Sequence, residues 1–143
     1  MSHAIIMETN LVEQQGTRSV SKAGLWTGRA ITGLVVLFLA LDGAIKFSRP
    51  APVVEAFAHV GWPIELAPVL GTILLACVIL YAVPRTAILG AVLLTGYLGG
   101  AVATHLRAGD PLFSHVLFPT YMGALLWTGL YLRDRRLRAL IQW

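Results

Sequence analysis

Apolar residues fall into four blocks along this chain, separated by short polar or proline-containing segments. Each block approaches the roughly 20 consecutive apolar residues that an α-helix needs to cross a bilayer. The blocks predict membrane spans over about residues 25–47, 64–83, 86–106 and 113–132, which form a membrane domain over residues 24–133. A polar tail precedes this domain over residues 1–23, and a short basic tail follows it over residues 134–143.

The segments between the blocks contain residues that end helices. Residues 48–52 include two prolines and an arginine, Pro84 and Arg85 form a very short turn, and residues 107–111 form another. Proline cannot continue a helix that faces lipid. Residues 53–62 repeat apolar side chains at helical spacing, so a short interfacial helix is expected there. Short turns make sequential helices antiparallel neighbours, and we predict an all-α fold that is a membrane-embedded antiparallel four-helix bundle.

Composition agrees with a membrane protein and excludes several other classes. Hydrophobic residues make up 57% of the chain and charged residues 13%, against about 25% charged in soluble domains. The net charge of +4 does not indicate a nucleic-acid partner, because the basic residues lie at the ends of apolar blocks. The single cysteine, Cys77, cannot form a disulfide within the chain or a cysteine-based metal site.

The distribution of basic residues predicts the orientation in the membrane. With four spans, both termini lie on one side, and that side holds most of the 11 lysines and arginines. The residues on that side are Arg18, Lys22, Arg29, Arg85, Arg133, Arg135, Arg136 and Arg138. The opposite side holds Lys46, Arg49 and Arg107. Because basic loops stay in the cytoplasm, both termini are predicted to be cytoplasmic.

The third span carries two stripes of small side chains. The first stripe repeats every four residues and comprises Ala87, Ala91, Thr95, Gly99 and Ala103. The second stripe comprises Gly96, Gly100 and Thr104. In lipid, close backbone packing replaces the hydrophobic effect as the force between helices. We therefore expect the third span at the centre of the bundle or at a contact between two copies.

Titratable residues gather at the predicted outer end, which holds Asp42 and Lys46 and also His59, Glu65, His105, Arg107, Asp110 and His115. Asp42 and Lys46 are four residues apart and share one face of the first span. An ionisable residue within a span is a candidate for function, although a structural ion pair at the rim explains these two residues as well. His105 and His115 flank the turn between the third and fourth spans, so they can face each other or Asp42. No recognised ligand spacing accompanies the histidines, and we predict no metal site.

Four segments of the sequence resemble the DoxX-like family of small bacterial membrane proteins. They are Asp-Gly-Ala-Ile-Lys at residues 42–46, LYAVPRTAILGA at 80–91, LLTGYLGGAVATHLR at 93–107 and LWTGLYLRD at 126–134. The resemblance covers about residues 25–142 and implies four spans in a bacterial inner membrane.

Relatives often carry a glutamate in the second span, about where Leu74 stands. This chain therefore lacks that carboxylate or uses Glu65 in its place.

The resemblance also implies a link to quinones or oxidative stress, because distant relatives include a subunit of thiosulfate:quinone oxidoreductase. We expect a redox-associated protein that binds a quinone-like ligand in the outer half of the bundle. Polar side chains would contact the ligand's oxygens, and tyrosines would contact its ring. The candidate ligand-binding residues are Asp42, Lys46, Tyr97, His105, His115 and Tyr121. No flavin, haem or iron–sulfur motif is present in the sequence, so a partner or the quinol would supply electrons.

Two alternatives belong to other functional classes. A non-enzymatic accessory or scaffold subunit would use the small-residue stripes to bind a larger membrane partner or a second copy. An oligomer could instead transport a small solute or protons, with Asp42 as the gate.

Overall fold

A computed structural model describes residues 21–141, so nearly all of the predicted polar tail lies outside the described residues. The described part is all-α, which confirms the predicted fold class. Its helices are α2 (Lys22–Ser48), α3 (Ala51–His59), η1 (Ile64–Leu66), α4 (Ala67–Ala82), α5 (Ala87–Ala108), η2 (Leu112–Val116), α6 (Phe118–Arg133) and α7 (Arg135–Ile141). The first span begins three residues earlier than expected, and part of the predicted basic tail is the helix α7.

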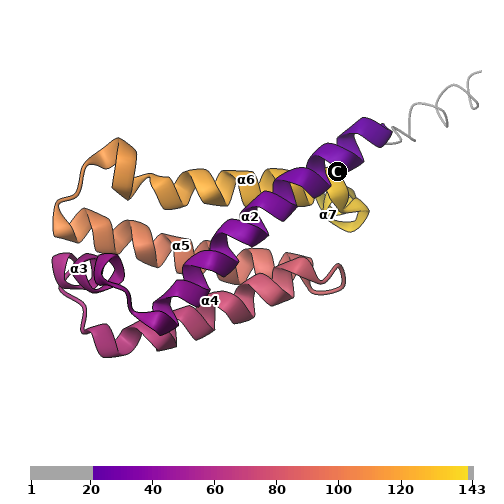
Figure 1. The fold of residues 1–143 in the computed structure, drawn as a ribbon. Helices are drawn as coiled ribbons and strands as arrows, with labels where there is room; N and C mark the ends of the chain where they lie inside the picture. Colours follow the sequence, from indigo (N-terminus) through magenta and orange to yellow (C-terminus); the bar gives the residue numbers. More distant parts are fainter. Residues whose placement is uncertain (1–20, 142–143) are drawn as a thin grey trace, which may run out of the picture.

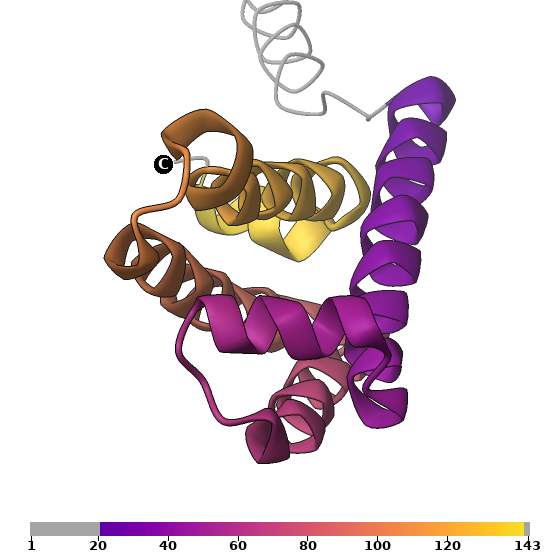
Figure 2. The same cartoon turned by 60° about the vertical axis from the view of Figure 1, so that its left-hand side comes forward.

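Four long helices pack around one core. α2 contacts α4 and α6, and α5 contacts the same two helices, so α2 and α5 occupy opposite corners. α4, α5 and α6 lie side by side and run in alternating directions (Figure 1). α2 crosses them obliquely, and Figure 2 shows this crossing from another side. The first helix is therefore inclined to the other three.

The core draws apolar side chains from all four of these helices. Leu74, Leu94 and Leu126 are completely buried, and Val35 is 2% exposed. Many large apolar side chains face outward instead, as they do in a protein that is solvated by lipid. Within the described residues, three helices are long and apolar enough to cross a membrane: Lys22–Ser48, Ile64–Ala82 and Ala87–Ala108.

The fourth predicted span, residues 113–132, has a different form. Leu112–Val116 is a π-helix, and α6 begins only at Phe118 and has 16 residues. Its length is about 24 Å at 1.5 Å per residue, against about 30 Å for the hydrocarbon core. Pro119 lies in the first turn of α6, where proline is tolerated because its missing N–H would be unpaired anyway. The same proline prevents a regular α-helix from continuing through residues 113–117.

Glycine allows close approach at two helix contacts. A Cβ atom on Gly90 would lie 2.5 Å from the Cα of Tyr81, across the turn between α4 and α5. A Cβ atom on Gly71 would lie 2.7 Å from the carbonyl oxygen of Gly43, where α2 crosses α4. These pairs set the distance between the backbones of neighbouring helices.

The small-residue stripes of α5 divide into two halves. Ala87 and Ala91 are 1% and 0% exposed and pack inside the core. In the second half, a Cβ atom on Gly96, Gly99 or Gly100 would meet nothing within 4 Å. Only the first half of α5 therefore uses its small residues for packing within the chain.

The two ends of the molecule differ in charge. The start of α2, the α4–α5 turn and α7 lie at one end, which we call the basic end; α3, the end of α5 and η2 lie at the other, the histidine end (Figure 1). The charged residues described at the basic end are Lys22, Arg29, Arg85, Arg133, Asp134, Arg135, Arg136 and Arg138. The first described helix begins at this end, and the last one lies at it. The predicted cytoplasmic position of the termini stays a prediction.

Candidate functional site

The short helix α3 lies across the histidine end and is attached to the end of α5. Pro52 lies in its first turn, and the chain leaves the helix through Gly61, which has a positive φ of 71°. Arg107 donates a hydrogen bond to the carbonyl oxygen of Val60. His59, the last residue of α3, pairs with Asp110 just beyond α5. The helix predicted within residues 53–62 is thus present and is joined to α5 by two polar contacts.

Asp110 stands between two histidines. Its Oδ2 atom lies 2.6 Å from Nδ1 of His105, and its Oδ1 atom lies 2.6 Å from Nε2 of His59. The Asp110 side chain is only 7% exposed, whereas the side chains of His59 and His105 are 59% and 32% exposed. The carboxylate is therefore enclosed, and both imidazole rings are open to their surroundings.

The turn after α5 places this carboxylate. Gly109 has a φ of 77°, in the left-handed region that favours glycine. The N–H of Gly109 donates to the carbonyl of Leu106, and the N–H of Asp110 donates to that of His105. These are the two hydrogen bonds of a Schellman motif, which ends a helix and turns the chain back. The reversal returns the side chain of Asp110 to the ring of His105.

Hydrogen bonds from His105, which has the larger effect, and from His59 hold the pKa of Asp110 below its usual value. Asp110 is therefore ionised at neutral pH, and an ionised carboxylate can only accept hydrogen bonds. It follows that His105 carries a proton on Nδ1 and His59 carries one on Nε2. In the neutral rings, Nε2 of His105 and Nδ1 of His59 are left as proton acceptors.

A pocket of about 350 Å³ opens beside this cluster, and we call it the histidine-end pocket. Its lining residues are Pro52, Glu55, Ala56, His59, Val60, His105, Asp110 and His115. The rings of His105 and His115 lie 6.2 Å apart between centroids, which confirms that these two histidines can face each other. The pocket thus combines three imidazoles and two carboxylates with an apolar wall from α3.

Asp42 and Lys46 form an ion pair with each other on α2. The Nζ atom of Lys46 lies 2.6 Å from Oδ2 of Asp42 and also donates to the backbone carbonyl of Asp42, at 3.0 Å. The side chain of Lys46 is 12% exposed and that of Asp42 is 43% exposed. These contacts fit the structural reading of the pair, and neither partner lines the histidine-end pocket.

The structure therefore separates the six candidate residues into three groups. His105 and His115 share the histidine-end pocket. Asp42 and Lys46 pair with each other on α2 and Tyr97 lies on α5, and none of these three residues lines that pocket. The Tyr121 side chain is 46% exposed on α6 and does not line the histidine-end pocket.

Sequence reasoning did not include two members of the pocket, His59 and Asp110, among the ligand candidates. Asp110 follows a glycine that ends α5, five residues after His105, and this spacing is a recognisable signal for a carboxylate that turns back to a helix end. His59 lies 51 residues from Asp110. No local pattern connects those two positions, because only the folding of α3 onto α5 brings them together.

No group of three or more histidine, cysteine, aspartate or glutamate side chains is placed to hold a metal ion within the part of the chain that the structure describes. Asp110, His59 and His105 form a hydrogen-bonded cluster.

The position where relatives often have a glutamate is part of the core. Leu74 is completely buried among apolar side chains. Glu65 lies in η1 and is exposed, outside the lining of the histidine-end pocket. An ionised side chain at position 74 would need a buried partner, whereas Leu74 packs among apolar side chains.

Comparison with known proteins supports the resemblance seen in the sequence. The sequence model of the DoxX-like family matches residues 30–129, which is more than two thirds of the 143 residues. The match runs from α2 to the second half of α6 and includes His59, His105 and Asp110. No curated protein and no solved structure matched the chain. With its family match and its three long apolar helices, the chain is a membrane protein that belongs to the DoxX-like family.

Proposed function

We propose that the protein binds the ring of a quinone-type ligand in the histidine-end pocket and exchanges protons with the ligand's oxygens. One observation carries the proposal: an enclosed carboxylate, Asp110, that holds two exposed imidazoles beside a pocket of about 350 Å³. Pockets of about 300–1,000 Å³ with a few convergent polar groups are typical ligand sites. The pocket also lies at the end of long apolar helices, where a membrane-dissolved ligand can reach it.

The pocket's own residues supply the proton chemistry. A quinone supplies two-electron, two-proton chemistry when it is bound. His105 Nε2 and His59 Nδ1 have no partner among the described residues. Each can accept a hydrogen bond from a quinol hydroxyl group and, once protonated, can donate one to a quinone carbonyl oxygen. The Asp110 carboxylate, hydrogen-bonded to the opposite nitrogens, stabilises whichever imidazole becomes protonated. Imidazole is the side chain that most often transfers protons to and from bound ligands in enzymes.

Asp42, Lys46 and Tyr97 lie outside the histidine-end pocket and do not contact the ligand in this proposal. Tyr97 precedes His105 by eight residues on α5, a rise of about 12 Å along a helix. The charges of Asp42 and Lys46 pair with each other, which lowers the free-energy cost of placing them in a helix surrounded by lipid. Tyr121 faces outward from α6, and the proposal assigns it no contact with the ligand.

Equilibrium binding to the purified protein in detergent tests this proposal. Isothermal titration with a short-tailed ubiquinone and a short-tailed menaquinone should show saturable binding. The variant D110N should bind about tenfold more weakly, a loss of about 1.4 kcal/mol, because it no longer fixes both imidazole tautomers. The matched control is D134N at the basic end, where asparagine still caps α7, and its affinity should stay within about twofold. Absence of binding to the parent protein, or equal losses in D110N and D134N, would contradict the proposal.

We further propose that the membrane is a bacterial inner membrane and that the basic end faces the cytoplasm. Seven basic residues and one acidic residue are described at the basic end. Such an excess of arginine and lysine marks cytoplasmic segments. In this orientation the histidine-end pocket opens on the outer side.

A second candidate function, that of an accessory subunit, is favoured by the open half of α5. Gly96, Gly99 and Gly100 have free space around them, so another helix could approach the backbone closely there. The partner would be a second copy or a larger membrane protein. Leucine at positions 96 and 100 would block such an approach, and light scattering in detergent would then show the loss of any dimer.

A further inference from the structure

We propose that an anionic phospholipid binds at the basic end, with an acyl chain in the groove between α6 and α7 and its phosphate on the arginines of α7. This inference concerns the opposite end of the molecule from the histidine-end pocket and does not depend on the proposed function. It rests on the shape of an apolar groove and on arginine side chains beside it.

The groove forms because the chain turns back after α6. Asp134 leaves the helical conformation, with a φ of −105° and a ψ of 114°. Its Oδ1 atom accepts a hydrogen bond of 2.8 Å from the N–H of Arg136 and a longer one, 3.4 Å, from the N–H of Leu137. An aspartate in this position caps the start of a helix. The cap starts α7 directly below the end of α6.

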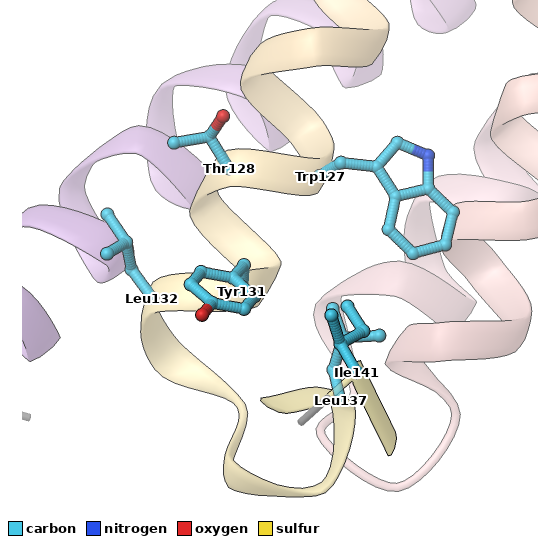
Figure 3. Close-up of a pocket in the computed structure, with 6 residues that line it drawn as sticks. All are labelled: Trp127, Thr128, Tyr131, Leu132, Leu137 and Ile141. Carbon is cyan, nitrogen blue, oxygen red and sulfur yellow. The ribbon is translucent and has the colours of Figure 1, made fainter. Parts of the chain in front are cut away.

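The groove has a volume of about 310 Å³ and an almost entirely apolar lining. The lining residues are Trp127, Thr128, Tyr131, Leu132, Leu137 and Ile141, as Figure 3 shows. Leu137 and Ile141 are four residues apart and share one face of α7. Leu137 is 6% exposed and anchors the helix, whereas Ile141 is 59% exposed at the edge of the groove. Trp127 and Tyr131 are of the types that gather where bilayer meets water.

Positive charge lies next to this apolar surface. Arg133 is already engaged, because it donates to the carbonyl of Tyr81 at 2.8 Å and lies over the ring of Tyr81. Arg135 and Arg136 are exposed, and among residues 21–141 their side chains form no hydrogen bond or ion pair that involves a carboxylate. The single acidic residue nearby, Asp134, uses its Oδ1 atom on the backbone of α7. The guanidinium groups of Arg135 and Arg136 therefore have no counter-ion among residues 21–141.

An anionic phospholipid complements both features at once. Its acyl chain matches the apolar lining, and its phosphate can pair with arginine, which binds phosphate oxygens in a bidentate manner. A soluble phosphate would use only the arginines, and a zwitterionic lipid would gain less from them because its headgroup also carries a positive charge. The basic end is also where the bilayer surface would lie if α2, α4 and α5 cross the membrane.

Native mass spectrometry of the detergent-solubilised full chain tests the inference, with phosphatidylglycerol and phosphatidylcholine of identical acyl chains in equal amounts. We expect the protein to retain phosphatidylglycerol roughly tenfold more than phosphatidylcholine, since each arginine near a charged headgroup favours binding by several-fold. The variant R135Q/R136Q should lose this preference, and R135K/R136K should keep most of it. I141W, which places bulk at the edge of the groove, should lower retention of both lipids.

The control R49Q/R85Q removes the same number of positive charges away from α7 and should keep the preference. Equal retention of the two lipids by the parent protein would overturn the inference. So would an equal loss of preference in R49Q/R85Q and R135Q/R136Q, which would indicate a general charge effect. Binding of glycerol phosphate as tight as that of phosphatidylglycerol would show that the groove contributes nothing and would overturn it as well.

Discussion

Asp110 shows how one side chain can organise a site at a membrane surface. A glycine at position 109 ends α5 and reverses the chain, so the carboxylate faces back to His105. The same carboxylate reaches His59 on α3. With both oxygens occupied and little exposure, Asp110 fixes the positions and the tautomers of two imidazoles while leaving their other nitrogens available.

The lowered pKa of Asp110 makes its contribution to stability dependent on pH. Its hydrogen bonds to His105 and His59 favour the ionised form in the folded state, so the folded pKa lies below the unfolded value of about 4. The contribution is present above that value and is lost as the pH falls through the lowered folded pKa. Thermal unfolding of D110N in detergent should therefore occur at a lower temperature than that of the parent protein above pH 5, and the two curves should converge in stronger acid. A constant difference between them from neutral pH into strong acid would contradict this account.

At the scale of elements, α5 has two halves with different surroundings. Its first half packs Ala87, Gly90 and Ala91 inside the core, and its second half leaves Gly96 and Gly99 without neighbours. The spacing of small residues is the same throughout, and the pattern alone does not distinguish a buried half from an open one. The first half is covered where α4 lies against it, at the contact between Tyr81 and Gly90.

Alanine substitutions at Gly90 and Gly99 should separate these halves. G90A places a methyl group 2.5 Å from the Cα of Tyr81, where backbone would have to move. Overpacking of this kind costs about 1–3 kcal/mol or more, so the melting temperature in detergent should fall by several degrees. G99A meets no neighbour and gains helix propensity, so its melting temperature should stay equal or rise slightly. Equal destabilisation of both variants would show that the second half of α5 is also packed.

The first three spans and α3 were predictable because they depend on local properties: hydropathy, helical spacing and the positions of proline. The residue at which α6 begins could not be predicted, because a proline near the start of an apolar block is compatible with either a kinked span or a shorter helix. The pairing of His105 with His115 was foreseen as one option, since a short turn connects them. The contact between His59 and Asp110 depends on how α3 folds across the bundle, and nothing near either residue encodes it.

For the whole molecule, the central feature is the difference between its ends. Histidines and carboxylates gather at one end, and arginines beside an apolar groove gather at the other. A protein with such ends is suited to a fixed orientation in the bilayer, with a ligand site on one surface and a lipid contact on the other. The first described helix begins at the basic end, and the last one lies there.

Cysteine labelling in cells that express the protein should reveal this orientation. A membrane-impermeant maleimide should label S48C and S114C from outside, because both serines are exposed at the histidine end. A139C at the basic end should react only after the cells are permeabilised. The native Cys77 is buried in α4 and should stay unlabelled, which provides an internal control. The reverse pattern of labelling would place the histidine-end pocket on the cytoplasmic side.

Photo-crosslinking with an azido-quinone tests the central claim most directly, because it locates the ligand without relying on any mutation. After illumination and proteolysis, mass spectrometry should find the label in residues 51–60 and 105–116, which contribute most of the lining of the histidine-end pocket. An excess of the unmodified quinone should compete this labelling away. Labelling confined to residues 127–141 around the other groove, or labelling that competitor does not reduce, would contradict the account.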